Sequence, residues 1–271
     1  MKKELIFLSS PEKVSMADEW FEIANADHFW MEWRFSVIEH AIKKIEGLSL
    51  SKRFLEIGCG HGAFLLQSEK KLKLITDGCD LNLFALKKSA DVTGDVYVYD
   101  ILELNPKMTG KYNGIFLLDV IEHIDNDEQF LKAAMEHTTD YGWVIINVPA
   151  LSFLFSKYDT VAGHKRRYSK KSITQLFKKC GIEPIHIQYW GFSLLPVALL
   201  RKLYLQFVPR QKVIDKGFNP GNAFTNKIFK LLMRMEIFMT KKPIIGTSLL
   251  AVGKKGSSLS LSTINNEILN N

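Results

Sequence analysis

The pattern of apolar residues first indicates a helix near the amino terminus. Apolar side chains recur at every fourth position over residues 28–46, and Gly47 ends the run. From residue 54 onward, short apolar runs alternate with helical stretches. The runs cover 54–57, 74–79, 96–99, 114–118 and 143–148. Helical patterns at 63–71, 83–90 and 127–137 fall between several of them, which predicts a doubly wound α/β fold with a mostly parallel sheet.

The pattern changes after Pro149. Residues 169–180 predict a helix capped by Ser169, and residues 185–189 and 248–252 predict two further strands. The chain between these strands is both apolar and basic, so we interpret 191–243 as an insertion between the last two strands. The end of the chain, 256–271, is rich in Ser and Asn and is expected to be disordered.

A glycine-rich segment gives the strongest local signal for a ligand site. The sequence FLEIGCGHG at 54–62 takes a buried strand directly into three alternating glycines, and a helical pattern follows. Glycines at such a turn let the backbone approach a ligand closely. The spacing differs from the G-x-G-x-x-G of dinucleotide-binding loops, which disfavours a pyrophosphate on the helix amino terminus. It favours a ligand that lies across the loop.

Two acidic residues strengthen this prediction. Asp80 ends the second strand-like run and Asp100 follows the third. Ligands of open α/β sheets bind outside the carboxyl ends of the strands, where a carboxylate accepts hydrogen bonds from ribose hydroxyls or from a base. The alternative for either aspartate alone is a helix cap, which the two together make less favoured.

In these features the sequence resembles the class I methyltransferases that depend on S-adenosylmethionine (SAM). The segment LLDVIEH at 117–123 is similar to the version in the ubiquinone-biosynthesis branch and its bacterial relatives. The resemblance implies a seven-stranded Rossmann-like methyltransferase sheet with an antiparallel final strand at 244–255, and a SAM-binding core over 51–190. The cofactor residues that it implies are Glu56, Gly58, Cys59, Gly60, Gly62, Asp80, Leu81, Asp100, Ile101 and Asp119.

Candidates for the transfer chemistry follow the fifth strand. The segment GHKRRY at 163–168 resembles a segment of methyltransferases for bacterial surface glycans and lipids. His164 could take a proton from a hydroxyl near neutral pH, and Arg166 and Arg167 could bind a phosphate or carboxylate of the substrate. Tyr168 is a further catalytic candidate. The alternative is a solvated basic loop that leads into a helix.

A second cluster, Asp119, Glu122 and His123, lies in the fourth-strand segment. We expect Asp119 to line the cofactor pocket and His123 to be the alternative base. Oxygen and imidazole ligands suit a divalent ion, but the acid pattern of metal-dependent relatives is only partly matched, so no metal ligand is assigned.

The amino-terminal segment, 1–50, resembles the helical lid of the same family. The resemblance implies that Trp30 covers SAM and that Arg34 meets its methionine carboxylate. An amphipathic helix packed on the sheet explains the other aromatic positions but not these two residues.

Charge is divided unevenly between the two halves of the chain. Residues 1–150 carry a net charge of −8 and residues 151–271 a net charge of +15. The basic half indicates an anionic partner. Residues 223–242 predict an amphipathic helix with basic and bulky apolar faces, which is typical of helices at anionic membrane surfaces, although such a face can also pack on a core.

These observations predict a cytoplasmic SAM methyltransferase, peripheral to the inner face of the membrane, that O-methylates a small, lipid-linked or glycan-related acceptor. Its three dispersed cysteines and the absence of a signal-peptide pattern agree with that compartment. The alternatives are an RNA methyltransferase, which the basic half would serve, and a SAM-binding regulatory module without catalysis. No RNA-binding domain is recognisable, so a nucleic-acid partner is not expected.

Overall fold

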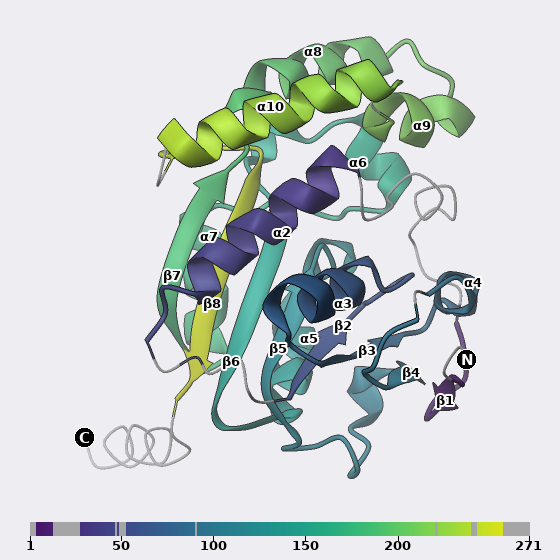
Figure 1. The fold of residues 1–271 in the computed structure, drawn as a ribbon, viewed down its shortest axis with the longest axis vertical. Coiled ribbons are helices and arrows are strands. Elements are labelled where there is room, and N and C mark those ends of the chain that lie inside the picture. Colours follow the sequence, from purple (N-terminus) through teal and green to yellow (C-terminus); the bar gives the residue numbers. More distant parts are fainter. Residues whose placement is uncertain are drawn as a thin grey trace.

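The alternating runs and helices fold into one sheet with helices on both faces (Figure 1). The structure, a computed structural model, describes residues 4–12, 28–46, 48, 53–89, 91–219, 222–239 and 243–256. The strands are β1 (Ile6–Phe7), β2 (Phe54–Ile57), β3 (Thr76–Asp80), β4 (Val96–Val98), β5 (Tyr112–Leu118), β6 (Thr138–Pro149), β7 (Ile182–Trp190) and β8 (Ser248–Lys255).

The strand order is β1-β4-β3-β2-β5-β6-β8-β7. All neighbouring pairs are parallel except those of β8, which runs antiparallel to both β6 and β7. The expected antiparallel final strand is therefore confirmed. The expected number of strands was wrong, because the sheet has eight strands rather than seven. The additional strand, β1, pairs through two residues with β4 at the edge of the sheet.

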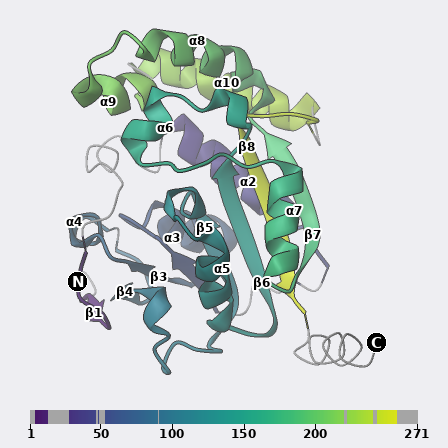
Figure 2. The ribbon, with the colours of Figure 1, turned by 180° about the vertical axis from the view of Figure 1, so that it is seen from behind.

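Successive side chains of the central strands point to opposite faces of the sheet, and each face is covered by a layer of helices. Phe116 and Leu118 of β5 pack on one face with α2 (Phe29–Ile42) and α3 (Ala63–Gln67). Ile115 and Leu117 point to the other face, with α5 (Asp127–Glu136) and α7 (Lys170–Lys179). The two views show these pairs of helices on opposite sides of the sheet (Figures 1 and 2). Burial on both faces is why the parallel strands read as continuous apolar runs.

The insertion forms a helical cap at one end of the sheet. Because β7 is parallel to β6, the chain leaves β7 at the edge where the parallel strands have their carboxyl ends. There it forms α8 (Leu195–Leu205), α9 (Val213–Phe218) and α10 (Ala223–Met239), which lie with α6 (Lys157–Ala162) above the sheet in Figure 1. No helix in the described ranges has both the length and the apolar composition needed to cross a bilayer.

Several sequence expectations fall outside the described residues. These are residues 1–3, 13–27, 47 and 49–50 of the expected lid, and 257–271 of the expected disordered tail. Within the described part, the helix expected at 28–46 spans 29–42, and the helix expected at 63–71 is α3 followed by a π-helical turn over Ser68–Leu72. The remaining short helix of the core is α4 (Leu83–Lys87).

Candidate active site

The glycine-rich loop turns sharply between β2 and α3. Gly58, Gly60 and Gly62 have φ angles of 75°, 55° and 74°, in the left-handed region where a side chain would be strained. The amides of Gly58 and Cys59 both donate to the carbonyl oxygen of Cys79, at 2.8 and 3.0 Å, and fix the loop to β3. The three glycines are thus required by the backbone conformation of the turn.

Asp80 lies directly beside this loop. One carboxylate oxygen accepts a hydrogen bond from the Gly60 amide at 2.8 Å, and the other accepts from the Asn82 amide at 2.8 Å. Burial raises the pKa of Asp80. Asp100 follows the neighbouring β4, and its side chain accepts from the Leu102 amide at 2.9 Å, as a helix cap does. Both predicted acids therefore lie at the carboxyl edge of the sheet.

The other predicted cofactor residues surround this edge. Cys59 and Ile101 are buried, and Leu81 is half-buried. The chain just after β1 crosses the same region, since the Glu12 amide donates to the Leu81 carbonyl at 3.1 Å and Ser9 donates to Glu103 at 2.7 Å.

An ion pair joins α2 to the end of β5. Arg34 Nη1 lies 2.7 Å from Asp119 Oδ2, and both side chains are largely buried. The other Asp119 oxygen accepts from Asn147 at 2.8 Å, and Asn147 in turn accepts from the Trp190 indole at 2.9 Å. The Arg34 guanidinium also lies over the Trp30 ring, 5.1 Å from its centroid. Asp119 has a φ of 62°, and such strained residues cluster at functional sites.

Glu56 is a buried acid near this ion pair. Its Oε2 has no hydrogen-bond partner among the described residues. Burial raises the pKa of Glu56 to about 8, against the opposing effect of Arg34. An orphaned buried oxygen of this kind indicates a polar ligand or a water molecule.

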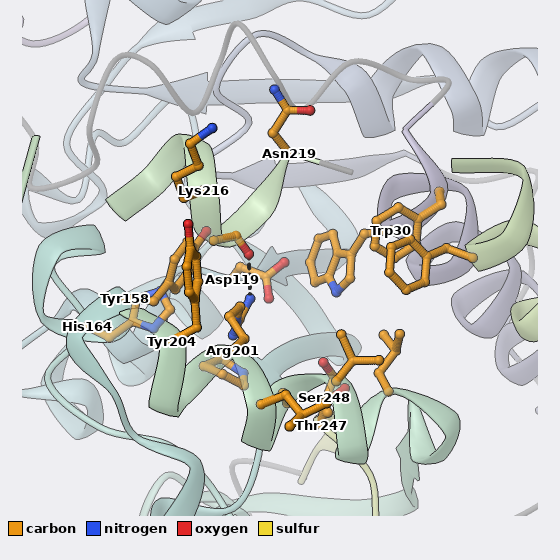
Figure 3. A pocket seen from close by; sticks show the side chains of 18 of the residues that line it. Trp30, Asp119, Tyr158, His164, Arg201, Tyr204, Lys216, Asn219, Thr247 and Ser248 are labelled. Carbon is orange, nitrogen blue, oxygen red and sulfur yellow. Dashed lines mark hydrogen bonds between the residues drawn. The ribbon is translucent and has the colours of Figure 1, made fainter. Parts of the chain in front are cut away.

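A pocket of roughly 500 Å³ opens beside Asp119 (Figure 3). Trp30 and Phe29 of α2 contribute one wall, and the insertion contributes another with Leu194, Val197, Ala198, Leu200, Arg201, Tyr204, Lys216 and Phe229. Among the described residues that line it, none belongs to the glycine loop, and neither Asp80 nor Asp100 is included. The pocket therefore lies beside the glycine loop and meets the predicted cofactor site at Asp119 and Trp30.

His164 lines this pocket and is held by a buried carboxylate. Its Nδ1 lies 2.9 Å from Asp159 Oδ1, and Arg167 Nε donates to the same oxygen at 2.8 Å. Burial opposes ionisation of Asp159, but the hydrogen bonds and charges of His164 and Arg167 outweigh it and lower its pKa well below the usual range. Since an ionised carboxylate can only accept, Nδ1 carries the proton and Nε2 is the basic nitrogen.

Glu122 lies in the same wall and is fully buried, and neither of its carboxyl oxygens has a hydrogen-bond partner among the described residues. Burial, together with the charge of Asp119, raises its pKa well above the usual range. Burial also lowers the pKa of His123 to about 3. One potential ligand atom each from Glu122, His123 and His164 lies within 4.8 Å of the others, a spacing that could hold a metal ion.

The rest of the basic segment lies outside this wall. Arg166 pairs with Asp127 at 2.9 Å and donates to the Asp125 carbonyl at 2.8 Å. The Tyr168 hydroxyl donates to Asp127 at 2.7 Å, and burial raises the pKa of Tyr168. Neither residue is among the described lining residues of the pocket, whereas Arg167 is.

Sequence reasoning missed Tyr158, Asp159, Asn147 and Arg201. Asp159 belongs to a capping box with Ser156 at the start of α6, which is a local signal for a helix end rather than for a site. Arg201 lies in the insertion, where the pattern indicated only a basic surface. No local signal marked Asn147, because its partners Asp119 and Trp190 are distant in the sequence.

Comparison with known proteins agrees with this geometry. Residues 30–187 match the family described as a methyltransferase domain, so the chain belongs to that family. The protein is a SAM-dependent methyltransferase, with SAM as its cofactor. No curated protein matched the sequence.

Solved structures show the same fold at low sequence identity. A SAM-dependent methyltransferase from Archaeoglobus fulgidus is 16% identical, with a TM-score of 0.51, over 83% of this chain and 94% of the other. The Haloferax volcanii complex of the Trm112 methyltransferase activator with a methyltransferase has a chain that is 12% identical, with a TM-score of 0.57, over 88% and 94%.

A third structure contains the cofactor. Haemonchus contortus phosphoethanolamine N-methyltransferase 2 in complex with SAM is 19% identical, with a TM-score of 0.50, over 81% of this chain and 52% of the other. This chain therefore spans about half the length of that enzyme.

Proposed function

We propose that the protein transfers the methyl group of SAM to a hydroxyl of a small amphiphilic acceptor, lipid-linked or glycan-related, bound in the pocket beside Asp119. The observation that carries this proposal is the pocket itself, which has apolar walls from the insertion and a histidine–carboxylate pair in its polar wall. The segments LLDVIEH and GHKRRY favour the ubiquinone-type and surface-glycan branches of the family.

The residues at the carboxyl edge fit the cofactor. The glycine loop gives close access to the backbone, and Asp80 and Asp100 supply acceptors for ribose hydroxyls and the adenine amino group, with Leu81 and Ile101 beside the ring. The methionine part carries an ammonium and a carboxylate. Arg34 and Asp119 offer the complementary charges, and the orphaned oxygen of Glu56 offers a further hydrogen-bonding atom. The cofactor supplies an electrophilic methyl group, and Trp30 and Arg34 belong to the lid that covers it.

His164 is assigned as the general base. Its Nε2 is free of the bond to Asp159, and a base at the pocket wall can remove the acceptor proton as the new bond forms. Asp159 orients the ring and stabilises the imidazolium that results, as the buried carboxylate of a catalytic triad does. His123 is the alternative base. We assign Tyr168 and Arg166 to holding the loop, through their shared bond to Asp127.

We propose that the outer face of the insertion binds an anionic membrane surface. Several apolar side chains of α8 and α10 and the turn after α8 are exposed, and Phe207 and Phe238 are each 87% exposed. Lys227 and Arg234 are also exposed, on α10. Apolar burial at the lipid boundary together with about 1 kcal/mol per basic residue supports attachment. An acceptor could then enter the pocket without leaving the interface.

A divalent cation is the second candidate for the polar wall, because Glu122 has no donor beside it and two imidazoles lie close. Glu122, His123 and His164 would hold the ion, which would supply positive charge at the acceptor oxygen. Calorimetric titration with Mg²⁺ and with Mn²⁺ tests this alternative. Saturable binding that is lost in His123→Ala would favour it, and the absence of binding would leave His164 as the base.

The proposed reaction is tested by following the methyl group. The protein is incubated with SAM labelled in its methyl group and a total bacterial lipid extract, and the labelled product is analysed. A label in the methyl ether of a lipid-phase molecule is expected. Label in added RNA instead would favour the RNA methyltransferase, and SAM binding with no labelled product in lipid, glycan or RNA would favour the regulatory module.

A further inference from the structure

We propose that Arg201 binds an anionic group of the acceptor, so that the substrates of this enzyme carry a carboxylate or phosphate near the oxygen that is methylated. This inference rests on the proposed function and narrows its substrate class. Arg201 comes from α8 of the insertion and lines the pocket beside Asp119 (Figure 3).

The partners of Arg201 leave its charge uncompensated. Nη1 donates to the Gly217 carbonyl at 2.9 Å, and the guanidinium lies over the Tyr158 ring, 4.7 Å from the centroid. Nε has no hydrogen-bond partner, and no carboxylate among the described residues lies within 4.0 Å of the guanidinium. Arg201 is half-buried, and this burial lowers its pKa.

The other two arginines of the site show the contrast. Arg34 has Asp119 at 2.7 Å, and Arg167 has Asp159 at 2.8 Å. A buried charge is ordinarily paired, because desolvation is costly. Of the three arginines, Arg201 is therefore the one available to a ligand among the described residues, and its planar fork suits the two oxygens of a carboxylate or phosphate.

Other charges of the pocket also favour an anionic ligand. The charge of Asp119 is compensated by Arg34, whose Nη1 lies 2.7 Å from Asp119 Oδ2. Lys216 adds a second positive charge, since its own contact with Asp215 is a half-exposed pair at 3.8 Å. Arg201 and Lys216 together give the insertion's wall of the pocket a positive charge.

The remaining walls define the rest of the ligand. Side chains of α8 and α10 make the adjoining surface apolar, with Leu194, Val197, Ala198, Leu200 and Phe229 among the lining residues. Arg201 lies on the side of the pocket that holds Tyr158 and His164, with its guanidinium over the Tyr158 ring (Figure 3). An acceptor with an anionic head and an apolar body fits both parts.

Binding of simple amphiphiles tests the inference. Wild-type protein saturated with S-adenosylhomocysteine is titrated in a calorimeter with octyl phosphate, octanoate and the neutral octanol. We expect at least one anionic probe to bind ten-fold or more tightly than octanol, which corresponds to a charge-assisted hydrogen bond. If only octyl phosphate binds more tightly than octanol, the anionic group of the acceptor is a phosphate. If octanoate binds as tightly as octyl phosphate, the site accepts either a carboxylate or a phosphate.

Two matched variants locate the effect. Arg201→Gln should abolish the preference for anions, whereas Arg210→Gln, which removes an exposed arginine of the same insertion, should keep it. Arg201→Lys keeps the charge and should retain part of the preference, so it replaces the glutamine variant if that one does not fold. Equal affinity of all three probes for the wild type, or an equal loss in Arg210→Gln, would overturn the proposal.

The cofactor serves as the internal control. S-adenosylhomocysteine should bind Arg201→Gln as tightly as it binds the wild type. A loss of its affinity that matches the loss for the anionic probe would move Arg201 to the cofactor site and contradict the inference. Failure of the wild type to bind S-adenosylhomocysteine at all would instead refute the proposed function, so the two failures are distinguishable.

Discussion

The Nδ1 atom of His164 lies 2.9 Å from Oδ1 of Asp159, and this contact joins the first turn of α6 to the basic segment that follows the helix. Asp159 also accepts hydrogen bonds from Arg167 and from the Ser156 amide, so the orientation of its carboxylate is fixed. The ring is thereby held in one tautomer with Nε2 as the basic nitrogen. This is the arrangement that a general base at the pocket wall requires.

The first prediction concerns turnover. His164→Ala should lower kcat by roughly 10²–10⁴ while SAM affinity stays nearly unchanged, because the residue touches the acceptor side of the site. Single-turnover kinetics with labelled SAM and calorimetry measure the two quantities. His40→Ala, at an exposed histidine of α2, serves as the control. Activity within a few-fold of the wild type would make His164 structural and His123 the better candidate.

The second prediction concerns the cofactor edge. Asp80→Ala should weaken SAM binding by roughly 1–3 kcal/mol, because the ribose hydroxyls lose their acceptor. Asp80→Asn keeps an oxygen for the Gly60 amide and should lose less. Calorimetry of folded variants gives the affinities, and an unchanged affinity in Asp80→Ala would remove this residue from the site.

A third prediction distinguishes a specific role of the glycine loop in SAM binding from the strain that valine causes at any positive φ. Gly60→Val should abolish SAM binding, because valine is strained at a φ of 55° and closes the approach to the backbone. Gly110→Val is the matched control, since Gly110 has a φ of 65° in an exposed turn with no atom within 4 Å of an added Cβ. SAM binding should survive there. Retained binding in Gly60→Val would contradict the assignment of the loop.

Glu56 leads to a prediction about pH. Its pKa is about 8 in the folded protein and near the ordinary 4.5 when unfolded, so the folded state holds an additional proton between these values. Stability from this group is therefore greatest below about pH 4.5 and is lost as the pH rises toward 8. The difference in unfolding free energy between Glu56→Gln and the wild type should grow in favour of the variant over that range. A difference that stays constant with pH would show that Glu56 is ionised throughout.

The fifth prediction concerns the membrane surface. Vesicles with anionic lipid should carry the protein upward in a flotation gradient at low salt, and high salt or neutral lipid should weaken the effect. The double variant Lys227→Glu and Arg234→Glu should lose most of the binding. Lys107→Glu, a charge reversal before β5 at the opposite end of the sheet, should not. Wild-type protein that stays unbound at low salt would refute attachment.

The sequence predicted those parts of the fold that local patterns determine. β2 was found at its observed bounds, because its residues are buried on both faces and a turn that requires glycine follows. β1 was missed, because two residues that pair with β4 across a long stretch of chain leave no periodic signal. For α10 the amphipathic pattern was correct, but it could not show that Phe229 and Met233 face inward while Phe224 and Phe238 stay exposed.

In the site, too, residues marked by a local pattern could be predicted, whereas contacts between distant parts of the chain could not. Asp80 could be predicted because it directly ends a strand next to the glycine loop in the sheet. The partners of His164 and Asp119 could not, since Asp159 resembles a helix cap and Asn147 lies within an apolar strand. The opposite charges of Arg34 and Asp119 were both noted, yet their pairing depends on how α2 packs across the sheet.

Transfer of label from SAM to a lipid shows whether the protein methylates an amphiphilic acceptor with His164 as the base. Wild-type protein and His164→Ala are each incubated with methyl-labelled SAM and a total bacterial lipid extract, and the label in the organic phase is identified by mass spectrometry. We expect an O-methylated amphiphile with the wild type and at least a hundred-fold slower formation with the variant. Label that forms equally fast with both proteins, or that enters only RNA or protein, would contradict this expectation.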